Sequence, residues 1–176
     1  MNTLVVSFFG GPGCGKSIFA ADTFARLKWK GILAELVTEY AKDKVYEEAT
    51  SIFDNQIYMF AKQHHRIKRV IHKTDVIITD SPFLLGVSYI KDENHYLEQL
   101  IVNEYKKLRT LNVFLKRAKS VLYETQGRHQ TLEESEKIDL SVKNVLQTYK
   151  IPYIEIDTHP NNVSNIISQI ENLIKL

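Results

Sequence analysis

The sequence is poor in the residues that build disulfide scaffolds, collagen-like repeats and flexible linkers. It has one cysteine, four prolines and seven glycines among 176 residues. A lone cysteine cannot form an internal disulfide, so a disulfide-stabilised extracellular domain is excluded and a cytoplasmic protein is expected. Composition of this kind predicts a globular chain, and its length fits one domain spanning residues 1–176.

Long apolar runs and an excess of one charge are also missing. No apolar stretch approaches the roughly 20 residues that a membrane span needs, so no membrane contact is expected. The apolar run near the N-terminus has no basic segment before it, and we interpret it as a strand and not a signal peptide. The net charge of +2 neither identifies nor excludes a nucleic-acid partner.

The most informative stretch is Gly10-Gly11-Pro12-Gly13-Cys14-Gly15-Lys16-Ser17. It matches the phosphate-loop pattern G-x-x-x-x-G-K-[ST], and it lies between an apolar run at 4–9 and a helical pattern at 18–25. Glycines let backbone N–H groups converge on an anion, and the helix N-terminus adds a favourable dipole. We therefore predict a site for ATP, with these donor-binding residues: Gly11, Pro12, Gly13, Cys14, Gly15, Lys16, Ser17 and Ile18.

Strand and helix patterns alternate along the rest of the chain. Strands are expected at about 3–9, 33–38, 76–79, 111–115 and 153–156, and helices at about 16–30, 41–48, 51–73, 94–109, 132–149 and 160–175, with 83–90 ambiguous. Alternation predicts an α/β fold in three layers, with a five-stranded parallel sheet and helices on both faces. Ligands of such sheets bind beyond the carboxyl ends of the strands.

Two acidic residues follow predicted strands at this edge. Asp80 comes after four apolar or β-branched residues, as a Walker B acid does, and we predict that it holds Mg²⁺ with Ser17. The alternative is a capping or turn aspartate before Ser81-Pro82. Glu39 is the candidate general base for a hydroxyl acceptor; it could also be a surface residue paired with Lys42, and Asp43 is a rival for the role.

A basic segment follows the fourth predicted strand and is expected to form a lid at about 117–131. Arg117 and Arg128 are predicted to stabilise the charge of a transferring phosphoryl group together with Lys16, and Gly127 would supply a turn. The alternative is a solvated basic loop.

The predicted helix 51–73 has two features of possible acceptor recognition. Gln56 and Gln63 are seven residues apart, share a face, and could bind the edge of a base, although simple surface placement would also explain them. The basic stretch 64–69 could contact polynucleotide phosphates or form one solvated face.

These motifs resemble a family. The stretches 10–17, 39–42, 78–82, 114–117 and 127–128 are similar to small P-loop kinases of the ribosylnicotinamide-kinase-like and deoxynucleoside-kinase-like kind. Within that branch, 39–43 and 127–130 resemble bacteriophage kinases acting on 5-hydroxymethyluridine in DNA. The resemblance implies transfer from ATP to a base-linked hydroxyl as a step in phage DNA hypermodification, in the host cytoplasm.

The sequence therefore predicts an ATP- and Mg²⁺-dependent P-loop kinase whose favoured acceptor is 5-hydroxymethyluracil in DNA. The first alternative is a kinase of a free nucleoside, nucleotide or nicotinamide riboside. The second is a nucleotide-dependent switch or ATPase with no phosphoryl acceptor. The oligomeric state is left open.

Overall fold

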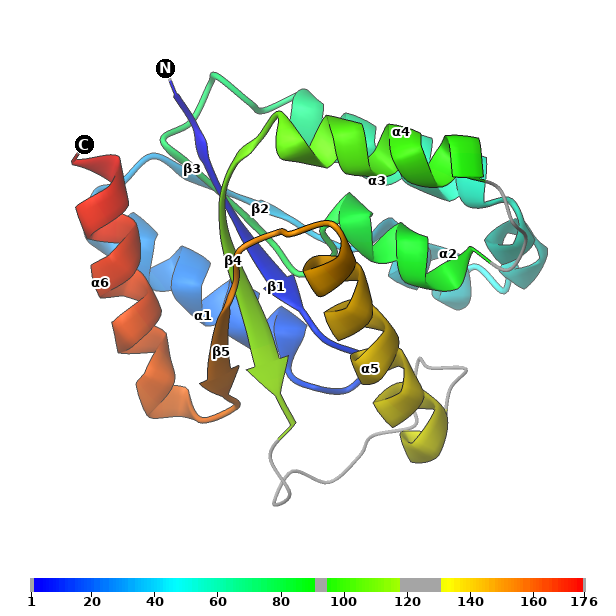
Figure 1. Ribbon diagram of the computed structural model, residues 1–176. Helices are drawn as coiled ribbons and strands as arrows, with labels where there is room; N and C mark the ends of the chain where they lie inside the picture. The colour runs from blue at the N-terminus through cyan, green and yellow to red at the C-terminus, as the bar shows by residue number, and fades with distance from the viewer. Residues whose placement is uncertain (1, 91–94, 118–130, 176) are drawn as a thin grey trace.

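Five parallel strands form the centre of the molecule, with the phosphate-loop strand in the middle (Figure 1). The computed structural model describes residues 2–90, 95–117 and 131–175. The strands are β1 (Leu4–Phe9), β2 (Ala34–Val37), β3 (Val76–Thr79), β4 (Arg109–Lys116) and β5 (Ile154–Asp157). Their order across the sheet is β2-β3-β1-β4-β5, so β1 pairs with β3 on one side and with β4 on the other.

Helices cover both faces of this sheet, as the alternating sequence pattern predicts. The α-helices are α1 (Lys16–Trp29), α2 (Tyr40–Tyr46), α3 (Gln56–Lys68), α4 (His95–Lys106), α5 (Leu132–Thr148) and α6 (Val163–Ile174), and the 3₁₀ helices are η1 (Thr50–Asp54), η2 (Phe83–Tyr89) and η3 (Pro160–Asn162). Helices α1 and α6 lie on one face, and α3, α4 and α5 lie on the other (Figure 1). The three-layer α/β architecture is thereby confirmed.

Each face of the sheet has its own apolar core. Side chains of β1 alternate between the two cores: Val5 and Phe9 pack with α3, η2, α4 and α5, whereas Val6 and Phe8 pack with α1 and α6. All six residues of β1 are buried, which explains why its sequence is apolar except at Ser7 and does not alternate with polar residues. This burial holds the strand that delivers the phosphate loop firmly in the middle of the sheet.

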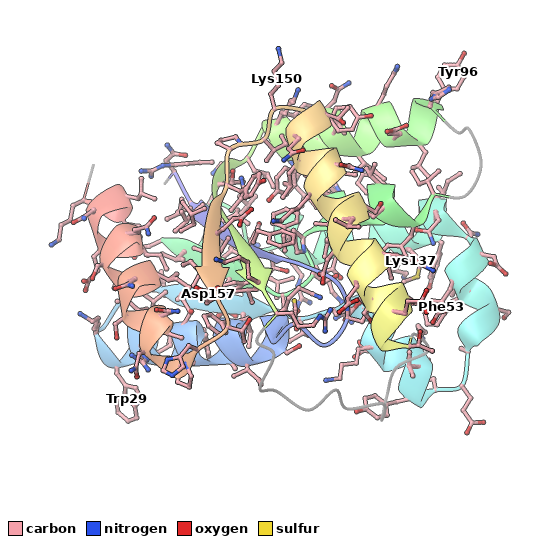
Figure 2. The ribbon with its side chains drawn as sticks, turned by 60° about the horizontal axis from the view of Figure 1, so that its bottom comes forward. Trp29, Phe53, Tyr96, Lys137, Lys150 and Asp157 are labelled. Carbon is pink, nitrogen blue, oxygen red and sulfur yellow. The ribbon has the colours of Figure 1, made fainter. Side chains whose placement is uncertain are left out.

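The helices leave some large side chains outside these cores. Trp29 at the end of α1 and Tyr96 at the start of α4 are 90% and 88% exposed, and both point away from the molecule (Figure 2). The stripe that α1 buries consists of Phe19, Ala20, Thr23 and Leu27. Of the described helices, none is long and apolar enough to cross a membrane.

One predicted helix is wrong in its extent. The expected helix at 51–73 is divided into η1 and α3, because the side chain of Asn55 accepts a hydrogen bond from the backbone N–H of Tyr58 and starts a new helix there. The helix ends at Lys68, and the following turn includes His72 with a φ of 66°. The ambiguous segment at 83–90 is the 3₁₀ helix η2. The predicted strand 76–79 agrees with β3 at both ends, and the ends of the other predicted elements differ from the structure by at most three residues.

Candidate active site

The loop between β1 and α1 has the backbone geometry of a phosphate cradle. Gly10, Gly13 and Gly15 have φ values of 136°, 77° and 95°, a region that side-chain-bearing residues rarely adopt. A Cβ on Gly10 would lie 2.6 Å from Cys14 Sγ, and one on Gly15 would lie 2.8 Å from Thr158 Cγ2. Both positions therefore require glycine for the backbone path and for the space beside it.

The loop ends at the start of α1, where Lys16 and Ser17 occupy the first turn. The Lys16 ammonium group donates hydrogen bonds to the carbonyl oxygens of Gly10 and Gly11, at 2.8 and 2.9 Å. Ser17 and Ile18 are exposed at the mouth of the loop, while Cys14 is buried beneath it. Free backbone N–H groups of the first helical turn and an adjacent ammonium group suit a polyphosphate.

Helix α5 braces the phosphate loop through Asp139, a residue that the sequence analysis did not single out. Asp139 Oδ1 accepts a hydrogen bond from the Gly11 backbone N–H at 2.5 Å, and Oδ2 accepts one from Arg117 Nη2 at 3.1 Å. Arg117 also donates to the carbonyl oxygen of Pro12 at 3.0 Å. The structure therefore places Arg117, the predicted lid residue, directly against the loop.

The contact between α5 and the loop depends on the absence of a side chain at Gly11. A Cβ there would lie 2.4 Å from the carbonyl oxygen of Ser135 and 3.0 Å from Asp139 Oδ1. In the sequence, Ser135 and Asp139 are four residues apart and therefore lie on one face of the predicted helix. This spacing is the sequence feature that could have pointed to the contact.

A second brace comes from the end of β5. Thr158 Oγ1 lies 2.9 Å from the carbonyl oxygen of Cys14 and 2.9 Å from that of Lys116, so one hydroxyl bridges the phosphate loop and the end of β4. This residue was also missed, because a single threonine after a strand gives no pattern in the sequence.

Asp80 lies where a Walker B acid is expected, at the end of β3. It is buried, and within the described residues its Oδ1 atom has no hydrogen-bond partner. A buried carboxylate oxygen without a protein donor is suited to a cation or to a cation-bound water. Asp80 and the exposed hydroxyl of Ser17 therefore fit the pair of protein oxygens that Mg²⁺ would use with nucleotide phosphates.

Glu39 lies at the junction between β2 and α2, one residue before the helix begins. Burial raises the pKa of its carboxyl group, and the nearby negative charge of Asp80 acts in the same direction, while the positive charge of Lys16 opposes the shift. The electrostatic influence of both residues indicates that Glu39 shares the site with Lys16 and Asp80. A carboxylate whose ionised form is disfavoured is a stronger proton acceptor than an ordinary glutamate.

The two glutamines of α3 have different surroundings. Gln63 is buried, and its side-chain amide binds the backbone on either side of Glu39. Gln56 is partly buried at the first turn of the helix, and its Nε2 atom donates to the carbonyl oxygen of Phe53 at 2.6 Å. They do not form one shared recognition face, because Gln63 is turned toward the β2–α2 junction.

The basic stretch of α3 is only partly available to a polyanion. Arg66 pairs with Asp43 at 2.5 Å, and Lys68 pairs with Glu104 at 3.5 Å. His64 lies 3.4 Å from the same Glu104. His65 and Arg69 are exposed and accessible to a polyanion, whereas Arg66 and Lys68 are paired with acidic side chains of the protein itself.

Among the predicted site residues, Arg128 lies outside the described part of the chain, as do Gly127 and most of the expected lid. The remaining catalytic candidates gather at the carboxyl edge of the sheet: Lys16 after β1, Glu39 after β2, Asp80 after β3 and Arg117 after β4. This is the arrangement that the parallel strands predicted.

Two solved structures are similar to this chain. The chain superposes on the NadR protein in complex with NR with a TM-score of 0.75 and 18% identity, over 99% of this chain and 52% of that chain. It therefore spans about half the length of NadR. It also superposes on deoxyadenosine kinase from M. mycoides with bound dATP, with a TM-score of 0.56 and 19% identity, over 98% of this chain and 100% of that one.

No curated protein matches the sequence. A model of an AAA-domain family matches residues 5–162, which include β1 from its second residue, the four other strands and most of the helices. The similarity to the two solved structures defines the fold. The family model covers more than half of the chain. The chain therefore belongs to this AAA-domain family, and its fold is that of the small P-loop kinases.

Proposed function

We propose that this chain is a kinase that transfers the γ-phosphoryl group of ATP to a hydroxyl group. The observation that carries the proposal is the grouping of Glu39 with Lys16 and Asp80 at the mouth of a complete phosphate loop. In a nucleotide switch or ATPase the same carboxylate would position water, whereas in a kinase it faces an acceptor hydroxyl, and the transfer assay below distinguishes the two. We treat residues 1–176 as one kinase domain.

The residues divide the chemistry of transfer among them. The acceptor oxygen attacks the γ-phosphorus and forms a new P–O bond, while the bond from that phosphorus to the β–γ bridging oxygen breaks and ADP leaves with the electron pair. Glu39 takes the hydroxyl proton. Lys16, the loop amides and Arg117 stabilise the charge that spreads over the phosphoryl oxygens, and Arg128 is proposed to add to them.

Ser17 and Asp80 would hold Mg²⁺. The ion would neutralise phosphate charge and orient the donor, and Asp80 would supply the buried oxygen that has no protein partner among the described residues.

The favoured acceptor is 5-hydroxymethyluracil in DNA. It is supported by the resemblance of residues 39–43 and 127–130 to phage kinases of that substrate and by the exposed basic residues of α3. A base within a duplex must leave the stack to reach Glu39, and Gln56 lies at the first turn of α3 as a candidate contact for its edge.

A free nucleoside, nucleotide or nicotinamide riboside is the second candidate acceptor. It is favoured by the ion pairs of Arg66 with Asp43 and of Lys68 with Glu104, which reduce the positive charge that α3 could offer to a polynucleotide. Binding of a small acceptor would depend little on salt, whereas binding of DNA would weaken steeply as salt is raised.

The decisive experiment is transfer of labelled γ-phosphate from ATP to a panel of acceptors: duplex DNA with and without 5-hydroxymethyluracil, free nucleosides and nicotinamide riboside. We expect label on the modified DNA and none with the K16A variant. Label on a free nucleoside or riboside alone would establish the second candidate. ATP hydrolysis without any labelled acceptor would refute the kinase proposal and favour the switch or ATPase.

A further inference from the structure

The side-chain amide of Gln63 binds the backbone on both sides of the proposed base. Its Oε1 atom accepts a hydrogen bond from the Tyr40 backbone N–H at 3.0 Å, and its Nε2 atom donates to the Thr38 carbonyl oxygen at 3.3 Å. Thr38 and Tyr40 are the two chain neighbours of Glu39. Because Gln63 is only 6% exposed, its hydrogen bonds are shielded from water and hold the junction in one conformation.

Arg66 makes a second attachment to the same junction, one helical turn further along α3. Its Nη1 atom donates to the Thr38 carbonyl oxygen at 3.1 Å, and its Nη2 atom donates to Asp43 Oδ2 at 2.5 Å. Its guanidinium group also lies over the Tyr40 ring, 5.2 Å from the centroid. One rigid helix is thus bonded to the residue before Glu39, the residue after it and the first turn of α2.

We propose that Gln63 and Arg66 are positioning residues that set the place of the Glu39 carboxylate in the active site. This inference rests on the proposed function of Glu39 as the general base. The junction needs such support because β2 is an edge strand of four residues, and among the described strands it pairs with β3 alone. Proton transfer requires the carboxylate within hydrogen-bond reach of the acceptor, and a displacement of about 1 Å can lower a rate about 100-fold.

A positioning role for Gln63 differs from the base-reading role that the sequence suggested. As a base-reading residue, Gln63 would have to break both backbone hydrogen bonds so that its side-chain amide could bind the acceptor. As a positioning residue it keeps them throughout the reaction. The two roles differ in which kinetic constant they control, because base reading governs acceptor binding and positioning governs turnover.

The experiment combines Gln63→Met and Arg66→Met with Glu39→Gln in double-mutant cycles. Methionine has nearly the length of glutamine and replaces the aliphatic part of arginine, but it cannot make these hydrogen bonds. We expect Gln63→Met to lower kcat about 10- to 100-fold, with the KM for ATP unchanged, and Arg66→Met to act in the same direction. In the Glu39→Gln background neither change should lower kcat further, because both act through Glu39.

Two controls separate this effect from a general loss of structure. Gln99 is exposed on α4, and Arg26 on α1 pairs with Asp22 on the opposite face of the sheet from α3, so Gln99→Met and Arg26→Met should leave kcat unchanged. Arg66→Lys, which retains charge but not the forked geometry, should recover only part of the Arg66→Met loss.

Hydrogen exchange tests the attachment without any activity. The Tyr40 amide should exchange slowly in the wild type and faster in Gln63→Met, while amides in β1 remain unchanged. If no acceptor is phosphorylated but this exchange result holds, the proposed function fails and the attachment stands. Unchanged exchange at Tyr40, additive losses of kcat with Glu39→Gln, or a rise in acceptor KM at unchanged kcat would each overturn the positioning role.

Discussion

At the scale of single residues, the site contains a carboxylate that folding places in an unfavourable environment. The pKa of Glu39 is raised chiefly by burial, so its ionised form is less stable in the folded protein than in the unfolded chain. In the pH range between the two pKa values the folded state binds more protons, and folding stability therefore falls as pH rises through that range. The full penalty is present once the pH exceeds the raised pKa of the folded state.

Replacing this carboxylate should therefore stabilise the protein while inactivating it. Glu39→Gln removes the ionisable group but keeps its size, so we expect the melting temperature at pH 7 to rise and kcat to fall about 10²- to 10⁴-fold. The gain in melting temperature should shrink below pH 4, where the wild-type carboxyl group is protonated in both states. Calorimetry across pH, with ATP affinity as a control for intact folding, checks both parts.

Asp139 supports a second residue-scale prediction, because its two oxygens have different partners. Asp139→Asn retains an acceptor for the Gly11 N–H but loses the negative charge beside Arg117, whereas Asp139→Ala loses both. We expect Asp139→Ala to lower the free energy of unfolding by about 1–3 kcal/mol and Asp139→Asn to lower it less. Urea unfolding measures the order, and equal losses in the two variants would contradict the separate roles.

The candidate site could be predicted from the sequence where the residues form a known pattern or follow a strand. The phosphate loop, Glu39 and Asp80 satisfy these conditions. Asp139, Thr158 and the backbone contacts of Gln63 do not, because each depends on which helix or strand folds beside the loop and the β2–α2 junction. Spacing in a sequence defines neighbours within one helix, but it does not define neighbours across the tertiary structure.

At the scale of elements, one side chain decides where α3 begins. Asn55 lies between η1 and α3, and its side-chain oxygen satisfies the Tyr58 N–H of the first helical turn. The apolar spacing continues across this position, so periodicity alone predicted one long helix. Strand positions were predicted more accurately, since continuous apolar runs in a parallel sheet are short and bounded by polar residues.

Removal of this helix cap should destabilise the molecule measurably. We expect Asn55→Ala to lower the free energy of unfolding by about 1 kcal/mol and the melting temperature by about 2–4 °C. Asn144 is exposed in the middle of α5, and Asn144→Ala is the matched control, because it replaces the same side chain where no helix start depends on it. A loss of similar size in both variants would argue against a capping role for Asn55.

At the scale of the whole molecule, the site joins elements from both ends of the described chain. The phosphate loop is bonded to α5 and to Thr158 after β5, so a ligand held by the loop would also stabilise the C-terminal part of the fold. The same part of the fold includes α6, which packs on α1.

A ligand that binds this loop should therefore stabilise the entire fold. At an ATP·Mg²⁺ concentration 100 times the Kd, binding adds about 2.7 kcal/mol to the free energy of unfolding. We expect the melting temperature to rise with ATP·Mg²⁺ in the wild type and far less in Lys16→Ala, with one cooperative transition in each. A thermal shift in Lys16→Ala as large as in the wild type would contradict binding at the loop.

The edges of the sheet affect how copies of the molecule behave when they are crowded together. Strands β2 and β5 lie at the two edges, each is four residues long, and acidic side chains of Glu35, Glu155 and Asp157 are exposed along them. Figure 1 shows β5 at one margin of the sheet. Short, charged edges are poor templates for strand pairing between molecules, so concentrated protein should resist aggregation through added β-structure.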